Sequence, residues 1–260
     1  MTQLGVSDSA LSRRLFSENK LAVNYVETQG PVVDTALTAF PNQKFLLHNA
    51  LWNWSLAHLR ALEHQDALQL TRQRLEQTKS PWLSVHLGFS AAEIQFDKTM
   101  QALSPALDRK TLLETIITNT WGLAETIDVP LLLENLDYNP GGAYEYICEP
   151  TFIAEVLERT NTGMLLDIAH ARVSASRFGT NIKDYLAPLP MERVKQLHIS
   201  GPRLVGETLR DAHEPLQAED YEVLEVVLSQ TNIRAVTLEY NKEEGELLEQ
   251  LQELRTMLQG

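Results

Sequence analysis

The chain has 260 residues, of which 43% are hydrophobic, and this is enough to build one sizeable core. The 35 acidic residues outnumber the 22 basic ones, which gives a formal charge of −13. This composition excludes a disordered chain, and the lack of clustered Lys and Arg argues against a nucleic-acid binder. No apolar run is long enough for a membrane span, and the N-terminus lacks a secretory signal pattern. The single cysteine, Cys148, cannot form an internal disulfide, so we expect a cytoplasmic protein.

Short apolar runs rich in β-branched residues recur along the chain and predict strands. Several are almost continuously apolar rather than alternating, which is typical of parallel strands covered on both faces. Seven such runs are Leu21–Glu27, Lys44–Asn49, Trp82–Gly88, Val129–Glu134, Gly163–Asp167, Val194–Ser200 and Arg234–Tyr240. We expect a further short strand around Leu209–His213, after an irregular connection, because the segment 200–211 is too short for a full helix.

Segments of helical period lie between the predicted strands. In Thr111–Glu125 the apolar residues recur at intervals of three and four, and similar patterns occupy Ser55–Gln77, Glu149–Thr160, Ala218–Gln230 and Glu243–Leu258. Alternation of strand and helix over the whole length indicates βαβ units. The sequence therefore predicts one α/β domain over residues 1–260, a (β/α)8 TIM barrel with the irregular connection between strands six and seven. An open doubly wound sheet is the alternative, but no Gly-rich dinucleotide turn supports it.

Potential metal ligands stand at or near the ends of successive predicted strands. Because all strands of a barrel run the same way, their carboxyl ends meet on one face. Asp211 and His213 are two residues apart on a predicted strand, so we expect both to point at one centre. The nine donors are His48, His86, Glu134, Asp167, His170, His198, Asp211, His213 and Glu239.

Nine nitrogen and oxygen donors on one face predict a site for about two or three divalent metal ions. The carboxylates would repel one another unless cations neutralised them. Imidazole and carboxylate ligands suit Fe, Zn or Mn, and spacing alone does not choose among these metals. A single histidine at a strand end is more often structural, so the prediction depends on the conjunction of all nine. The other two histidines, His58 and His64, fall in a predicted helix and are interpreted as surface residues.

Further residues near the strand ends are candidates to contact a substrate or to orient the ligands. Asn135 directly follows Glu134, Arg172 could pair with a substrate carboxylate, and Tyr240 ends the last predicted strand. We take Asn135, Arg172 and Tyr240 as the catalytic candidates, although ordinary packing or surface pairing accounts for such residues at least as often. Other polar and aromatic residues in the same region are Asn49, Trp52, Asn53, Tyr138 and Ser200.

Several longer stretches carry a resemblance to a known family. They are LLHNALWNWS (47–55 with the preceding Leu46), SVHLGFS (84–90), LLLEN (131–135), TGMLLDIAHARVSA (162–175), LPMERVKQLHISG (189–201), DAHEP (211–215) and LEY (238–240). On these residues the chain resembles the multinuclear non-haem iron-dependent oxidative enzymes. Those enzymes are TIM barrels of the xylose-isomerase-like and endonuclease-four superfamily. The resemblance is most specific between Leu131 and Pro215 and weaker in the first forty residues.

The resemblance implies a chemistry and a ligand set. Family members oxidise cysteine residues of small peptides with two or three irons and dioxygen, often with a separate substrate-presenting partner protein. Carried over, the pattern makes eight of the nine donors ligands, with Glu134 and Glu239 as bridging candidates. The remaining donor, His170, departs from the pattern, because the family commonly has Asn three residues after the Asp. An Asp-x-x-His there is similar to the endonuclease-four zinc pattern, in which that His binds the third metal.

We therefore expect a metal-dependent oxidoreductase, with iron as the first choice, acting on a peptide or small thiol-containing substrate. Two other enzyme classes stay open. A hydrolase of the endonuclease-four type would use the same ligands, but the charge of −13 disfavours DNA as its substrate. A sugar isomerase or epimerase would usually have a site richer in carboxylates. A barrel that binds metal only structurally is the non-enzyme alternative.

Overall fold

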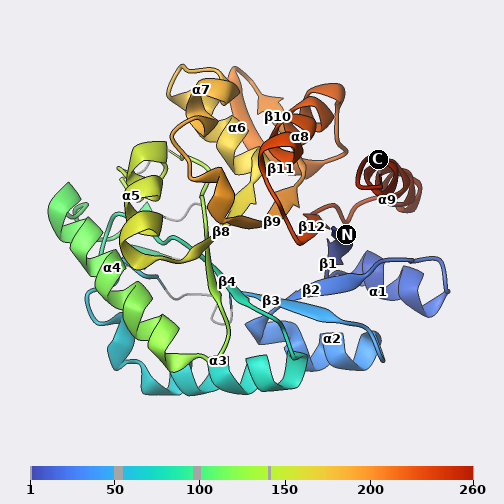
Figure 1. The fold of residues 1–260 in the computed structure, drawn as a ribbon, viewed down its shortest axis with the longest axis horizontal. Helices are drawn as coiled ribbons and strands as arrows, with labels where there is room; N and C mark the ends of the chain where they lie inside the picture. Colours follow the sequence, from blue (N-terminus) through green and yellow to red (C-terminus); the bar gives the residue numbers. More distant parts are fainter. Residues whose placement is uncertain (1, 50–54, 96–100, 140–141, 260) are drawn as a thin grey trace.

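The computed structural model describes residues 2–49, 55–95, 101–139 and 142–259 (Figure 1). Within these ranges eight parallel strands close into a barrel in the order β1-β12-β9-β8-β7-β4-β3-β2, which confirms the predicted architecture. The barrel strands are β1 (Gln3–Ser7), β2 (Tyr25–Gln29), β3 (Phe45–His48), β4 (Leu83–His86), β7 (Leu131–Glu134), β8 (Gly163–Asp167), β9 (Val194–Ile199) and β12 (Ala235–Leu238).

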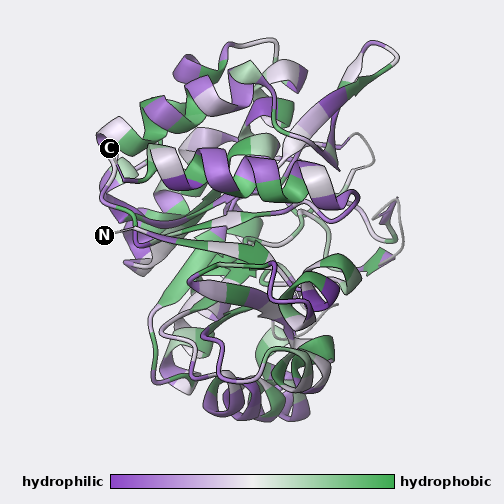
Figure 2. Ribbon diagram, turned by 90° about the vertical axis from the view of Figure 1, so that its right-hand side faces the viewer, coloured by the Kyte–Doolittle hydropathy of each residue, from purple (hydrophilic) through white to green (hydrophobic). Residues whose placement is uncertain are grey.

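Helices surround the barrel, and Figure 2 shows that they carry hydrophilic and hydrophobic residues in alternation, as helices packed on one face do. In the described ranges they are α1 (Ala10–Ser17), α2 (Val33–Ala39), α3 (Gln65–Thr78), α4 (Arg109–Thr126), α5 (Pro150–Thr160), α6 (Ile168–Arg177), α7 (Ile182–Leu186), α8 (Ala218–Gln230) and α9 (Glu244–Met257). Short 3-10 turns are η1 (Gly30–Val32), η2 (Ala61–Glu63) and η3 (Met191–Arg193). None of the described helices is both long and apolar enough to cross a membrane.

The first barrel strand differs from the prediction. It is β1, whose five residues QLGVS were not predicted as a strand, and the segment predicted as the first strand supplies the second, β2. A short strand interrupted by glycine gives little sequence signal. Packing explains why residue 5 is glycine, because a Cβ atom there would lie 2.3 Å from Cε2 of the Tyr25 ring.

The predicted strand around Leu209–His213 is wrong as a barrel strand. It lies within β11 (Thr208–Glu214), which pairs antiparallel with β10 (Gly201–Val205) in a separate two-stranded hairpin. Gly206 adopts a φ of +64° in the tight turn between them, a conformation that favours glycine. The polar sequence of β11 cannot fill a barrel wall that is covered on both faces. The irregular connection therefore lies between β9 and β12, the seventh and eighth barrel strands, and not between the sixth and seventh.

Four of the five predicted helices agree with the structure to within two residues at each end. The exception is the predicted helix 55–77, because α3 begins only at Gln65 and the residues before it form turns and η2. His58 and His64 consequently lie in this irregular segment, where His64 is exposed and His58 half-buried. A second small antiparallel pair, β5 (Ile94–Gln95) and β6 (Gln101–Ala102), follows β4.

Alternate residues of the barrel strands stack in layers inside the barrel. The lower layer is a hydrophobic cluster of Tyr25, Leu46, Trp82, Leu132, Leu165 and Ala235. Successive side chains of a strand point to opposite faces, so the residue two positions later lies one layer higher on the same face. Those residues are Glu27, His48, Ser84, Glu134, Asp167 and Thr237, all of them polar and buried. The register that packs the apolar floor thus places a polar layer at the carboxyl ends of the strands.

Candidate metal centre

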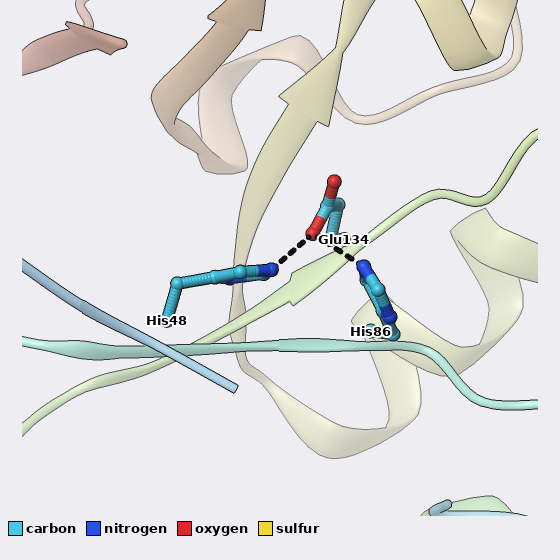
Figure 3. A group of neighbouring side chains, drawn as sticks. All are labelled: His48, His86 and Glu134. Carbon is cyan, nitrogen blue, oxygen red and sulfur yellow. Dashed lines mark ion pairs between the residues drawn. The ribbon is translucent and has the colours of Figure 1, made fainter. Parts of the chain in front are cut away.

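Three neighbouring strands bring two histidines and a glutamate to one point (Figure 3). His48 ends β3, His86 ends β4 and Glu134 ends β7. Oε2 of Glu134 lies 3.1 Å from Nε2 of His48 and 3.4 Å from Nε2 of His86. Nδ1 of His48 lies 2.9 Å from the hydroxyl of Ser84, so its Nε2 is left facing the carboxylate. This group offers three ligand atoms to one cation.

The second oxygen of Glu134 faces a second group. Oε1 lies 3.5 Å from Nδ1 of His198 on β9. The same nitrogen lies 3.9 Å from Oδ2 of Asp167, which ends β8, and 3.5 Å from Oε1 of Glu239, which follows β12. Glu134 therefore presents one oxygen to each group, which is the arrangement of a bridging carboxylate.

The third group combines the β10–β11 hairpin with α6. Nε2 of His213 lies 2.8 Å from Oδ2 of Asp211, and Nε2 of His170 lies 3.7 Å from the same oxygen. Nδ1 of His170 donates to the carbonyl oxygen of Asn135 at 2.9 Å, because that oxygen can only accept. Oε2 of Glu239 lies 3.8 Å from Nε2 of His213, so this carboxylate also faces two groups. The structure thus brings all nine predicted donors into one connected cluster.

Three buried atoms of this cluster have no hydrogen-bond partner among the described residues. They are Oε2 of Glu134, Oδ2 of Asp167 and Nδ1 of His198. A buried polar atom without a partner is destabilising, and native proteins rarely keep one without a reason. These side chains offer ligand atoms that all lie within 4.8 Å of one another. Unpaired carboxylate oxygens and an imidazole nitrogen at this separation fit a divalent cation.

The protonation of the cluster reflects its burial and its charges. Burial raises the pKa of Asp167 to about 7, and the carboxylate of Glu239 adds to this against the opposing effect of His170. Burial by itself would lower the pKa of His213, but its hydrogen bond to Asp211 and the nearby carboxylates raise it to about 9. The metal-free cluster therefore holds protons that a bound cation would displace.

The three catalytic candidates make different contacts. The side chain of Asn135 bonds reciprocally to the backbone of Asp167, with both distances 2.9 Å. Arg172 donates to the buried carboxylate of Asp220 on α8. The hydroxyl of Tyr240 accepts from the N–H of Glu243 at 3.2 Å, just before α9. Of these contacts, those of Asn135 alone reach a member of the cluster.

The other residues singled out in the sequence also include some that contact the cluster and some that do not. Nδ2 of Asn49 lies 2.6 Å from Nε2 of His48, and the hydroxyl of Ser200 donates to Oδ1 of Asp211 at 3.0 Å. The ring of Tyr138 packs against Phe178, with 5.1 Å between the ring centroids. Trp52 and Asn53 lie outside the described residues. Cys148 is buried in the turn that precedes α5, as its position in the sequence predicted.

Sequence reasoning missed one acidic residue of the centre. Glu27 on β2 is 4% exposed, and its Oε1 lies 2.7 Å from Nε2 of His198. It ends the predicted strand 21–27, so the criterion that selected the other carboxylates at strand ends would also have selected Glu27.

Comparison with known proteins agrees with this geometry. The model of one family, described as RiPP precursor modification enzyme MbnB/TglH/ChrH, matches residues 19–259. The chain belongs to this family. A UPF0276 protein of Caulobacter vibrioides is 30% identical over 149 residues, which are 57% of this chain and 52% of the relative. The chain thus spans about half the length of this curated relative.

Solved structures show the same fold at low sequence identity. A D-tagatose 3-epimerase-like protein matches with a TM-score of 0.70 and 15% identity, covering 99% of this chain and 97% of that one. Endonuclease IV from Thermus thermophilus matches with a TM-score of 0.62 and 14% identity, covering 99% of each chain. These similarities confirm the xylose-isomerase-like TIM barrel, and the family match confirms the resemblance found in the sequence.

Proposed function

We propose that this chain is a metal-dependent oxidoreductase that modifies a cysteine-containing precursor peptide, with two or three iron ions held at the mouth of the barrel. The observation that carries the proposal is the convergence of nine donors around three buried atoms without hydrogen-bond partners. Membership in a family of RiPP precursor modification enzymes supports a peptide as the substrate.

The grouping of the side chains supports a specific assignment of ligands. His48, His86 and Glu134 hold one ion, and Glu134 shares its second oxygen with the neighbouring group. The groups proposed for the other two ions are Asp167, His198 and Glu239, and His170, Asp211 and His213. Glu134 and Glu239 are the bridging carboxylates, because each presents its two oxygens to different groups.

When bound, iron supplies the redox chemistry that an oxidation by dioxygen requires. The protein's own part is to fix the ligands and to exclude water. Ser84 orients His48, and Asn135 holds the backbone of Asp167, so we assign Asn135 a positioning part. Arg172 and Tyr240 contact groups outside the cluster, and the proposal gives neither of them a step in the reaction.

The exposure of the ligands indicates where a substrate enters. The side chains of His86 and His213 are 36% and 39% exposed, whereas those of Glu134 and His198 are 1% exposed. A peptide thiol therefore reaches the centre from the edge formed by His86 and His213. We include a separate substrate-presenting protein in the proposal, because the resemblance found in the sequence implies one. We also propose that the enzyme acts in the cytoplasm, where a lone thiol stays reduced.

The proposal is tested on protein purified without oxygen. Metal analysis should give two or three irons per chain, with a near-ultraviolet charge-transfer band. Oxygen should then be consumed in the presence of a cysteine-containing precursor peptide together with its presenting protein, and the peptide should change in mass. The matched control is the same peptide with Cys replaced by Ser, which should give neither result. Protein that holds a full complement of zinc and leaves both peptides unchanged would contradict the proposal.

A second candidate function is metal-dependent hydrolysis of a small phosphorylated substrate, which the position of His170 favours. Its Nε2 faces Asp211 and completes a third ligand group of the kind that a three-metal hydrolase uses. His170→Asn separates the two functions. If the oxidative function holds, Asn can take the place of His170 beside Asp211 and His213, and this variant keeps its metals and its oxidative activity. Loss of one stoichiometric metal together with phosphodiesterase activity of the wild type would favour the hydrolase.

A further inference from the structure

Beside the metal centre lies a buried polar network that contains none of the proposed ligands. It contains Glu27, Gln196 and Thr237, which come from three different barrel strands, together with Tyr25 and Trp82 from the apolar floor. All five side chains are buried. A carboxylate in such a place is destabilising unless it is hydrogen-bonded.

The hydrogen-bond donors of this network all lead towards the carboxylate of Glu27. The indole N–H of Trp82 can only donate, and it lies 2.7 Å from Oε1 of Gln196. This contact fixes the orientation of the amide, whose Nε2 donates to Oε2 of Glu27. On the other side the Thr237 hydroxyl donates to the same oxygen at 3.3 Å, and the Tyr25 hydroxyl lies 2.9 Å from that of Thr237. Both chains of donors therefore end at Oε2 of Glu27.

The remaining oxygen of Glu27 accepts from His198. Oε1 lies 2.7 Å from Nε2 of His198, closer than any of Glu134, Asp167 and Glu239 lies to this imidazole. Because donors from Gln196 and Thr237 already point at Glu27, the carboxylate acts as an acceptor here, so Nε2 of His198 carries the hydrogen. The other ring nitrogen, Nδ1, then faces Glu134, Asp167 and Glu239 and has no hydrogen-bond partner among the described residues.

We infer that Glu27 is a positioning residue that fixes the Nε2–H form of His198 and thereby directs Nδ1 to the metal. The inference rests on the proposed function, since it assigns a supporting residue to the second ion of that site. Carboxylate–histidine–metal arrangements of this type orient the ring and increase the basicity of the ligand nitrogen, and loss of such a partner typically weakens metal binding by about 10–100-fold.

The first test examines the imidazole itself. Nitrogen-15 NMR of wild-type protein loaded with diamagnetic Zn²⁺ should show His198, assigned through its absence in His198→Gln, with hydrogen on Nε2 and the metal on Nδ1. The opposite form, with hydrogen on Nδ1, would overturn the inference. This result is independent of whether the protein binds iron, so it separates failure of the inference from failure of the proposed function.

The second test measures metal binding by Glu27→Gln, which keeps the shape of the side chain and removes its charge. Titration with Co²⁺ under anaerobic conditions should show one ion bound about 10–100-fold more weakly, with the others unchanged. Ser84→Ala should instead weaken the binding of the ion held by His48. Glu222→Gln, on the exposed surface of α8, should leave the affinity for every ion unchanged. Wild-type affinity of every ion in Glu27→Gln would overturn the inference, and so would a crystal structure of the metal-loaded enzyme with Glu27 bound directly to the metal.

Discussion

Asp211 and His213 differ from the other proposed ligands because they lie on a hairpin outside the barrel. His213 adopts a φ of +45°, an uncommon conformation for a residue other than glycine. Its Nε2 lies 2.8 Å from Asp211, so the hairpin brings this pair to the mouth without contributing a strand to the barrel wall. The two residues can therefore be changed with little effect on the core.

For this reason the double variant Asp211→Asn, His213→Gln should lose one metal ion per chain and keep its fold. Metal analysis gives the stoichiometry, and a thermal unfolding curve of metal-free protein checks the fold. Replacing the exposed Glu207 and Arg210 of the same hairpin by Gln should leave the metal content unchanged. An unaltered metal content in the double variant would show that the assignment of this pair is wrong.

For individual residues, the sequence predicted which side chains lie together better than it predicted the contacts that each side chain makes. Seven of the nine donors stand at or near the ends of barrel strands, which converge, whereas Asp211 and His213 were selected on a predicted barrel strand that is a hairpin. The contacts of Arg172 with Asp220 and of Tyr240 with Glu243 could not be foreseen, since they depend on how α8 and α9 pack. Glu27 was overlooked although it ends a predicted strand, and its role appears only from its contact with His198.

Among the elements, β1 depends on a close contact with its neighbour. Gly5 on β1 stands opposite Tyr25 on β2, and a Cβ atom at Gly5 would overlap the tyrosine ring. Tyr25 is buried and its hydroxyl lies 2.9 Å from that of Thr237, so a shift of the ring would disturb this contact. The absence of a side chain at Gly5 is thus a condition for closing the barrel between β1 and β2.

Gly5→Ala should accordingly lower the free energy of unfolding by about 1–3 kcal/mol, the usual cost of overpacking a core. Urea unfolding of the metal-free protein measures this change. Gly245→Ala is the matched control, because nothing lies within 4 Å of a Cβ atom there and the residue is in α9. Alanine should be neutral or stabilising by up to about 1 kcal/mol at that position. Equal stability of the two variants would contradict this explanation of Gly5.

The apolar barrel strands were predictable because burial on both faces leaves almost uninterrupted hydrophobic runs, as in the LLLE segment of β7. Two other elements could not be predicted from the sequence. β1 is short and contains Gly5, and the hairpin β10–β11 has the length and position of a strand but a polar sequence. The helix start at Gln65 was missed because the apolar spacing continues through the turns before it. That residues 1–260 form a single domain stays a prediction.

For the molecule as a whole, proton release should accompany metal binding. In the metal-free protein the pKa of Asp167 is raised to about 7 and that of His213 to about 9, so both groups hold protons near neutral pH. Ligands bind metal in their deprotonated forms, so protons compete with the ion. As the pH falls from 8 to 7, affinity should fall by about tenfold because of the proton on His213, and below pH 7 the proton on Asp167 should add up to about another tenfold per pH unit. Calorimetry in buffers of different ionisation enthalpy counts the protons, and a pH-independent affinity would contradict the protonated state described here.

The central claim is that side chains at the ends of six barrel strands, on α6 and on one hairpin share metal ions at a common mouth. Anomalous scattering at the iron edge, from crystals of protein purified and grown without oxygen, tests this most directly. We expect two or three peaks, one between His48, His86 and Glu134 and one beside Nδ1 of His198, each within bonding distance of its ligands. A well-ordered cluster without anomalous peaks, its carboxylates neutralised by protons or by arginine, would contradict the account.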